Sequence, residues 1–291
     1  MRIDPIILGH NQFIGVDHLS QDRARNHTER FSDTQRILDV VKIFYDLGGT
    51  GMMLSTHPKA MTIMEAIGSE PELSKKLNLY PLIPYAQGYV RRANEKGVIG
   101  MVTDTLGSAS TSRKFKILLK GGVGMLRKDF LNILSTLIDV EMLPFKESNV
   151  KAVFLHNVLT DLALSLKAQG IFEFYIDYIK DNYGVAPAFG TMNFARLVES
   201  FDEWGLKKPL IMASFNRAGF QMNPTREECE RCLGEYDVEV LAMSTLAAGY
   251  LKPEEAYEYL FSLPNIKSVV VGISTREHAE ETFGIIREHC K

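Results

Sequence analysis

Short apolar runs alternate along this chain with longer segments in which apolar residues recur at helical spacing. The run from Lys151 to Leu155 is a clear example, because it ends abruptly in His156 and polar residues and has helical segments on both sides. Such runs, bounded by turn residues, are typical of parallel strands in an alternating β/α chain. Eight runs of this kind occur, at residues 6–8, 51–54, 79–83, 151–155, 187–193, 209–216, 238–243 and 268–272.

Eight strand–helix units predict an α/β protein, most simply a (β/α)8 TIM barrel, with an open doubly wound sheet as the alternative. No linker or low-complexity tract interrupts the units, so we predict a single domain over residues 1–291. Residues 85–149 break the alternation and are expected to form a long, mostly helical insertion between the third and fourth strands. This insertion is either a cap over the barrel or an enlarged outer helix pair. The polar stretch with His18 and His27 is predicted to be a loop.

Composition narrows the class of protein. With 45% hydrophobic and 24% charged residues, the chain has the balance of a globular protein. Its net charge is −3 and its basic residues are scattered, so the sequence does not predict a binding surface for nucleic acid or an anionic membrane. No apolar stretch is long enough to cross a bilayer. Three cysteines are too few for a disulfide framework, which indicates a reducing compartment, by default the cytoplasm. We therefore expect a small-molecule substrate, while the oligomeric state stays open.

Functional residues in β/α folds lie at the carboxyl ends of the strands. His10, His57 and His156 follow the first, second and fourth runs, and Tyr85 follows the third, so we predict that these four residues are catalytic. Three imidazoles from separate strands could bind a divalent metal ion and activate water, or could divide general acid and base roles. The simpler alternative is that each histidine is singly hydrogen-bonded at a strand end. Carboxylates are sparse at these ends, which weakens the metal interpretation.

Five segments between about residues 150 and 285 resemble, in order, motifs of the aldo/keto reductases. The first, Leu155-His156-Asn-Val-Leu-Thr-Asp161, resembles LHxPD. The others resemble GvSNF, YNP, ysPLagGlL and GxsspexleEN, and begin at Gly190, Phe215, Met243 and Val271. The resemblance implies a barrel oxidoreductase that binds NADP(H) and whose histidine, here His156, orients the substrate carbonyl. It implies cofactor contacts at Asn193, Asn216, Ser244, Gly272, Ser274, Thr275 and Arg276.

The chain also departs from that family. The resemblance implies an acid tyrosine supported by a lysine and an aspartate, but residues 53–59 contain neither aspartate nor tyrosine, and the third strand ends at Tyr85 without a lysine. Met243 stands where a tyrosine would stack on the nicotinamide. We therefore predict an enzyme that acts on a small polar or carbonyl-containing substrate through His156 and His57 and is not an ordinary NADPH reductase. The alternatives are a metal-assisted hydrolase or lyase using the three histidines, and a non-catalytic binding barrel.

Overall fold

The computed structural model describes residues 3–16, 21–85 and 126–289. The predicted helical pieces of the insertion at residues 89–101 and 112–120 lie outside the described residues. The helix predicted at residues 129–143 is α6, which spans Leu126–Met142. The predicted insertion ends within the short strand β4, Asn149–Val150, which pairs with the start of β3, Asn78–Ile83.

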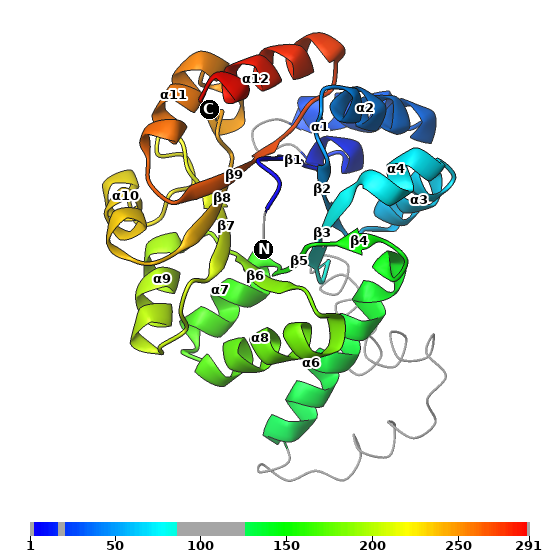
Figure 1. The fold of residues 1–291 in the computed structure, drawn as a ribbon. Coiled ribbons are helices and arrows are strands. Elements are labelled where there is room, and N and C mark those ends of the chain that lie inside the picture. Colours follow the sequence, from blue (N-terminus) through cyan, green and yellow to red (C-terminus); the bar gives the residue numbers. More distant parts are fainter. Residues whose placement is uncertain (1–2, 17–20, 86–125, 290–291) are drawn as a thin grey trace, which may run out of the picture.

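Eight parallel strands close into a barrel (Figure 1). They are β1 (Ile6–Leu8), β2 (Gly51–Ser55), β3 (Asn78–Ile83), β5 (Ala152–Leu155), β6 (Ala186–Gly190), β7 (Leu210–Ser214), β8 (Glu239–Met243) and β9 (Ile266–Val271). Their order is β2-β1-β9-β8-β7-β6-β5-β3, and pairing of β2 with β3 completes the ring. The predicted (β/α)8 barrel is therefore confirmed, and the open-sheet alternative is wrong.

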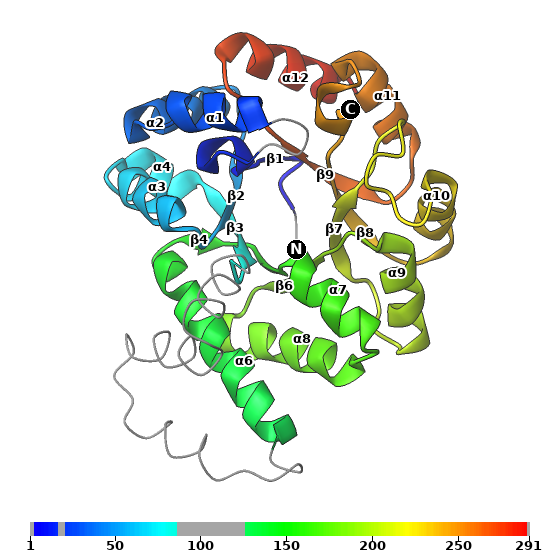
Figure 2. The same ribbon diagram turned by 180° about the vertical axis from the view of Figure 1, so that it is seen from behind.

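Helices surround the barrel, as the two opposite views of Figures 1 and 2 show. They are α1 (Gln21–Arg30), α2 (Thr34–Asp46), α3 (Pro58–Gly68), α4 (Pro71–Lys76), α6, α7 (Asn157–Ser165), α8 (Gln169–Tyr183), α9 (Phe194–Glu203), α10 (Arg226–Glu235), α11 (Pro253–Ser262) and α12 (Arg276–His289). Short 3-10 turns lie at Asn11–Ile14, Leu143–Phe145 and Ala247–Gly249. Within the described ranges, no helix has the length and apolarity that a membrane crossing requires.

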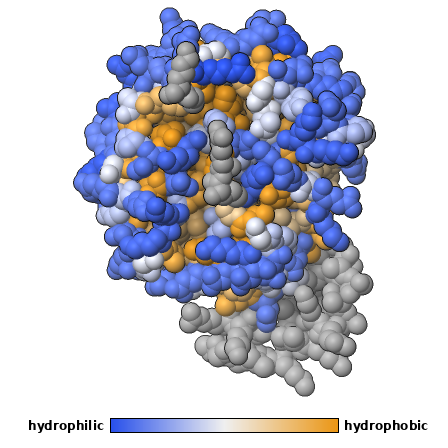
Figure 3. All heavy atoms as spheres, viewed as in Figure 1, coloured by the Kyte–Doolittle hydropathy of each residue, from blue (hydrophilic) through white to orange (hydrophobic). Residues whose placement is uncertain are grey.

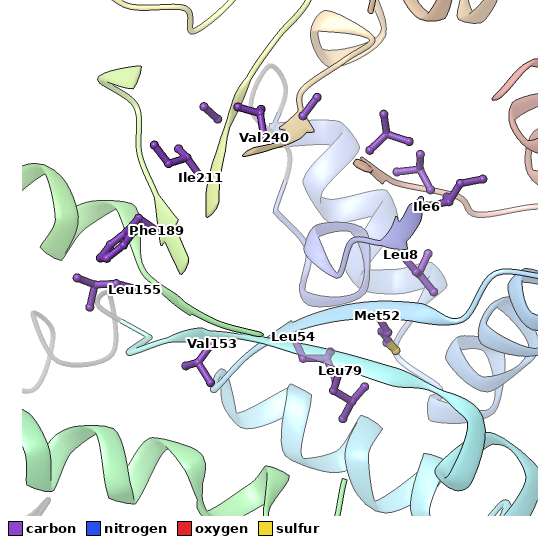
Figure 4. Close-up of a cluster of buried hydrophobic side chains, with 14 of the residues drawn as sticks. Ile6, Leu8, Met52, Leu54, Leu79, Val153, Leu155, Phe189, Ile211 and Val240 are labelled. Atoms are coloured by element: carbon purple, nitrogen blue, oxygen red, sulfur yellow. The ribbon is translucent and has the colours of Figure 1, made fainter. Parts of the chain in front are cut away.

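The strands are apolar on both faces because each face is buried. Outward side chains such as Leu54, Val153 and Ile211 pack against the helices (Figure 4). Inward side chains, among them Met53 and Phe154, fill the barrel. This double burial explains why the strands read as continuous apolar runs rather than alternating ones. In the space-filling view, hydrophilic residues cover the helices while hydrophobic residues show between them (Figure 3).

Helix α1 corrects the prediction of a polar loop around His27. Residues Gln21–Arg30 are almost all polar, so they carry no apolar stripe that would have indicated a helix. The helix is followed at once by the buried Phe31, whose ring packs edge-to-face on Phe13 with centroids 5.1 Å apart. The contact between Phe31 and Phe13 thus helps to position a helix that hydrophobic periodicity does not reveal. His18 lies outside the described residues.

Hydrogen bonds to Asp4 close the amino-terminal end of the barrel. Its buried carboxylate accepts hydrogen bonds from the Thr50 and Tyr80 hydroxyls and from the Asn78 amide, the last at 2.9 Å to each oxygen. The Asp4 backbone N–H donates to the Tyr80 oxygen at 3.0 Å. Burial, and then the bond to Asp4, raises the pKa of Tyr80, which keeps its hydroxyl protonated.

Candidate functional site

Two of the predicted catalytic histidines begin helices in the same way. His57 is the N-cap of α3 and His156 is the N-cap of α7, with nearly equal backbone angles of φ −58°, ψ 141° and φ −61°, ψ 140°. Nδ1 of His57 accepts the Lys59 N–H at 3.1 Å, and Nδ1 of His156 accepts the Val158 N–H at 3.3 Å. The hydrogen-bond pattern therefore assigns the proton of each neutral ring to Nε2, so that Nε2–H is a donor on the far side of the ring.

His10 lies close enough to the other two histidines to sense their charge. Its side chain is 5% exposed, and burial lowers its pKa to about 4, with further lowering by His156 and His57. A hydrogen bond with the backbone of Met53 opposes this change. Burial also lowers the pKa of His156 to about 4. The structure thus brings the three predicted histidines together, with His10 and His156 neutral at pH 7.

Tyr85 belongs to the same group of side chains. Its ring meets that of His57 edge-on, with centroids 4.9 Å apart and an interplanar angle of 82°. The Tyr85 N–H donates to Thr56 Oγ1 at 3.3 Å and to the Glu141 carboxylate at 3.2 Å, and the Thr56 hydroxyl donates to the same carboxylate. A side chain of α6 therefore ties together the loops that carry His57 and Tyr85.

Glu141 is a residue that the sequence analysis missed. Its side chain is 7% exposed and lies on the face of α6 that also buries Leu134 and Ile138. A carboxylate three positions after a buried isoleucine, on an otherwise apolar helix face, is the signal that could have identified it. Its partners could not be identified from the sequence, because Thr56 lies 85 residues away.

The motif segments of the second half are joined by hydrogen bonds. Asp161 on α7 accepts hydrogen bonds from the Thr191 hydroxyl and from the Met192 N–H, the latter at 3.0 Å. Thr191 Oγ1 also accepts the Asn193 N–H at 2.9 Å. Asn193 is the half-buried N-cap of α9, and its side chain makes no capping hydrogen bond. The helix after His156 is thereby fixed to the loop after β6.

Two further predicted cofactor residues are engaged by the loop that follows β7. Asn216 is fully buried, and its amide donates to the Phe220 carbonyl and accepts the Phe220 N–H, each at 2.8 Å. The Ser244 hydroxyl donates to Gln221 Oε1 at 3.4 Å, and Ser244 itself has a left-handed φ of 54°. The Asn216 amide therefore closes its own loop.

Thr275 and Arg276, two of the predicted cofactor contacts, lie at the start of α12. Thr275 Oγ1 accepts the His278 N–H at 3.2 Å, which is a helix cap. The exposed Arg276 pairs with Asp46 at 3.6 Å and with Glu280 at 3.7 Å. Thr275 therefore caps α12, and Arg276 joins α12 to α2.

Ser274 and Gly272 precede that helix. Arg30 Nη2 donates to the Ser274 carbonyl at 2.6 Å. A Cβ added at Gly272 would lie 3.3 Å from Gln12 Oε1, so glycine lets the Gln12 amide approach the strand end. Gln12 is held there because its Nε2 donates to Gly9 O at 2.9 Å. Met243 stands at the platform position, and the Asn216 amide is engaged by its own loop.

The placing of the described side chains gives the metal alternative no support. In the described part of the chain, one group of three side chains brings its ligand atoms within 4.8 Å of one another, namely Glu199, Glu228 and Cys232. Both carboxylates of that group already pair with Arg231. His10, His57 and His156 do not form such a group, and Nδ1 of two of them accepts a backbone hydrogen bond.

The fold and site together define a (β/α)8 barrel with three of its histidines, His10, His57 and His156, gathered at the carboxyl ends of the strands. Solved structures share this fold. One, provisionally described as an aldo-keto reductase from Pseudomonas aeruginosa, has a TM-score of 0.57 at 12% identity and covers 99% of this chain and 90% of that chain. An aldo/keto reductase from Brucella melitensis has a TM-score of 0.50 at 14% identity and covers 97% and 87%.

The chain therefore has an aldo/keto-reductase-like barrel, as its motif segments indicated. At these identities the likeness concerns the fold alone. No family model matches the sequence, and no curated protein matches it. The low identities fit a divergent sequence on a shared barrel.

Proposed function

We propose that this protein is an enzyme that acts on a small polar, carbonyl-containing substrate at the carboxyl end of its barrel. In this proposal His156 and His57 donate hydrogen bonds from Nε2–H to the substrate carbonyl oxygen. Negative charge that develops on that oxygen in the transition state is then stabilised by two fixed donors. Reactions that build such charge at a carbonyl oxygen are the class that this arrangement serves.

The repeated histidine cap is the observation that carries the proposal. A backbone N–H fixes Nδ1 of each ring as an acceptor, at 3.1 Å for His57 and 3.3 Å for His156. The low pKa of His156, about 4, supports a neutral donor rather than an imidazolium acid at pH 7. A neutral imidazole can polarise a carbonyl through its N–H, as enzymes of other families do.

Tyr85 and Glu141 complete the proposed site by holding His57 in place. The Tyr85 ring packs on the His57 ring, and the Glu141 carboxylate accepts from Tyr85 N–H and from the Thr56 hydroxyl next to His57. In this arrangement Glu141 is a positioning residue, because it acts through its neighbours. Rigid support of this kind keeps a donor aimed at its target without reorganisation.

We further propose that the protein is not an ordinary NADPH reductase. The occupied Asn216 amide, the capping role of Thr275 and the pairing of Arg276 with Asp46 support this part. A titration followed by NADPH fluorescence checks it, and we expect no saturable binding. Saturable micromolar binding would reject it.

The cytoplasm remains the compartment that we propose. Cys229 and Cys232 are buried free thiols, and burial raises the pKa of each to about 11. Buried thiols of this kind are unreactive and compatible with a reducing environment. They support a packing role for this pair rather than redox chemistry.

A substrate panel with histidine variants tests the function. Carbonyl compounds of three to six carbons are screened for turnover, and His156→Ala and His57→Ala are then compared with the wild type. We expect kcat/KM to fall about 10²- to 10³-fold in each variant, the usual cost of removing one oxyanion donor. His278→Ala on the exposed face of α12 is the matched control and should retain full activity.

Two outcomes would contradict the proposal. Full activity in both site variants would remove the histidines from the reaction. Binding of carbonyl compounds with no turnover across the panel would favour a non-catalytic binding barrel.

A further inference from the structure

The pairing register shows which side chains point into the barrel. Ser55, at the end of β2, pairs with Leu82 of β3, and Ser214, at the end of β7, pairs with Met243 of β8. Leu82 and Met243 pack with the apolar side chains that fill the barrel. Because successive residues of a strand alternate between faces and paired residues share one, both serine side chains point inward.

Ser55 and Ser214 lie at one level with His156. In a tilted eight-stranded barrel, the side chains of one level come from alternate strands. Here β2, β5, β7 and β9 alternate. Ser55 and Ser214 are the last residues of β2 and β7, and His156 and Gly272 directly follow β5 and β9, so continuing the register places these four residues at the uppermost level. β2 and β7 are four strands apart in both directions around the ring, so the two serines lie on opposite sides of the barrel.

Both serine hydroxyls are buried and unpaired. Each residue is 3% exposed, and neither Oγ has a hydrogen-bond partner among the described residues. A buried hydroxyl without a partner is costly, so native proteins rarely keep one unless water, a ligand or a function requires it. Two such groups at the level of a candidate catalytic histidine point to a polar ligand.

The surroundings favour an uncharged ligand. The inward positions of the next level down are Gly9, Leu82, Gly190 and Met243, and neither level carries a cationic side chain. Burial keeps the pKa of His10 and His156 near 4, so both are neutral at pH 7. An anion placed here would have no charge partner on these two levels and would be desolvated at high cost.

We propose that this uppermost level is a binding subsite for an uncharged hydroxy-carbonyl compound, such as a short sugar aldehyde or ketone. The inference rests on the function proposed above, in which His156 donates to the carbonyl oxygen. Ser55 and Ser214 bind hydroxyl groups on either side of that carbonyl. A serine hydroxyl both donates and accepts, as a sugar hydroxyl does, so each pair satisfies both partners.

Ligand affinity measured by NMR titration tests the subsite. Glyceraldehyde and dihydroxyacetone are compared with propanal, which has no hydroxyl, and with glycerate, which is an anion. We expect the wild type to prefer the hydroxylated carbonyl compounds about 10-fold or more over both others. Ser55→Ala and Ser214→Ala should each reduce that preference about 3- to 10-fold, the usual effect of one neutral hydrogen bond.

Ser268→Ala is the matched control. Ser268 also points into the barrel, because it pairs with the inward-facing Leu241, and its buried Oγ is likewise unpaired. It lies on β9 four residues before Gly272, well below the uppermost level. The control variant should keep the wild-type preference. All three variants should unfold at the wild-type temperature or above it, since each removes an unpaired polar group without removing a contact.

Three results would overturn the subsite. They are the absence of any preference for hydroxylated ligands, an unchanged preference in both Ser55→Ala and Ser214→Ala, and an equal loss in Ser268→Ala. The first two would mean that ordered water alone satisfies these hydroxyls. Failure of the proposed function is distinguishable, because it appears as full turnover in His156→Ala whatever the serine variants do to binding.

Discussion

The two ends of this barrel use polar side chains in opposite ways. At the amino-terminal end, the Asp4 carboxylate accepts from Thr50, Asn78 and Tyr80. At the carboxyl end, the hydroxyls of Ser55 and Ser214 have no partner among the described residues. The Asp4 group therefore has its hydrogen bonds satisfied, whereas Ser55 and Ser214 leave donors and acceptors available.

This difference indicates which end of the barrel contributes stability and which end carries chemistry. A saturated buried network rigidifies the structure, whereas an unsatisfied buried group lowers stability and is retained where a ligand can satisfy it. The same division holds generally in (β/α)8 barrels, whose bottom face contributes stability and whose top face carries function. Substitutions at the two ends should therefore separate into stability effects and activity effects.

The largest expected effect is at Asp4, at the amino-terminal end of the barrel. Asp4→Ala leaves the Tyr80, Thr50 and Asn78 groups buried without their acceptor, and we expect a loss of about 4 kcal/mol in the free energy of unfolding. Urea unfolding measures it, with exposed Asp181→Ala as the control. Activity per folded molecule should stay at the wild-type level. A loss of activity without a loss of stability would break the proposed division.

A second effect is the dependence of stability on pH, which should arise from His10 at the carboxyl end of the barrel. The pKa of His10 is about 4 in the folded chain and near 6.5 when unfolded, so the unfolded state binds the additional proton between these values. Stability is complete above pH 6.5 and falls as the pH falls, by about 2 kcal/mol from His10 between pH 6.5 and pH 5. Urea unfolding at several pH values checks this.

The matched variant for the pH prediction is His10→Gln, in which the slope of stability against pH should be smaller. His156, whose pKa is also lowered by burial, adds a slope of the same sign. An unchanged slope in His10→Gln would contradict the assignment of this pH effect to His10 at the carboxyl end of the barrel.

A smaller effect is expected at Glu141. Glu141→Ala removes the acceptor that joins Thr56 to Tyr85 and so loosens His57, and we expect kcat to fall about 10-fold with little change in KM. Glu141→Gln keeps one acceptor oxygen and should recover most of the activity, while exposed Glu147→Ala should have none of these effects. An equal rise of KM in the alanine and glutamine variants would indicate a direct substrate contact instead.

The strands could be predicted because both of their faces are buried and their residues are apolar throughout. Helix α1 could not, since nine of its ten residues lack the apolar character that reveals a helix face. Its position depends on Phe31 packing against Phe13, a contact between separate segments.

The site was predictable in part for the same kind of reason. Strand ends converge at one face, so His10, His57 and His156 could be grouped from their positions alone. The tautomers of His57 and His156 depend on a backbone N–H two residues later, which spacing does not specify. Glu141 lies on a helix 85 residues beyond Thr56 in the sequence, so its contact with Thr56 could not be predicted. The lack of a partner at the Ser55 and Ser214 hydroxyls depends on all of their neighbours in the fold.

The state of His156 tests the central claim most directly. In nitrogen-15 NMR of histidine-labelled protein, with His156→Gln used to assign the signal, the account predicts a neutral ring with its proton on Nε2 from pH 8 down to pH 5. Addition of a bound hydroxy-carbonyl ligand should shift the Nε2 signal and leave the Nδ1 signal in place. A proton on Nδ1, or a titration midpoint near the ordinary histidine pKa, would contradict the account.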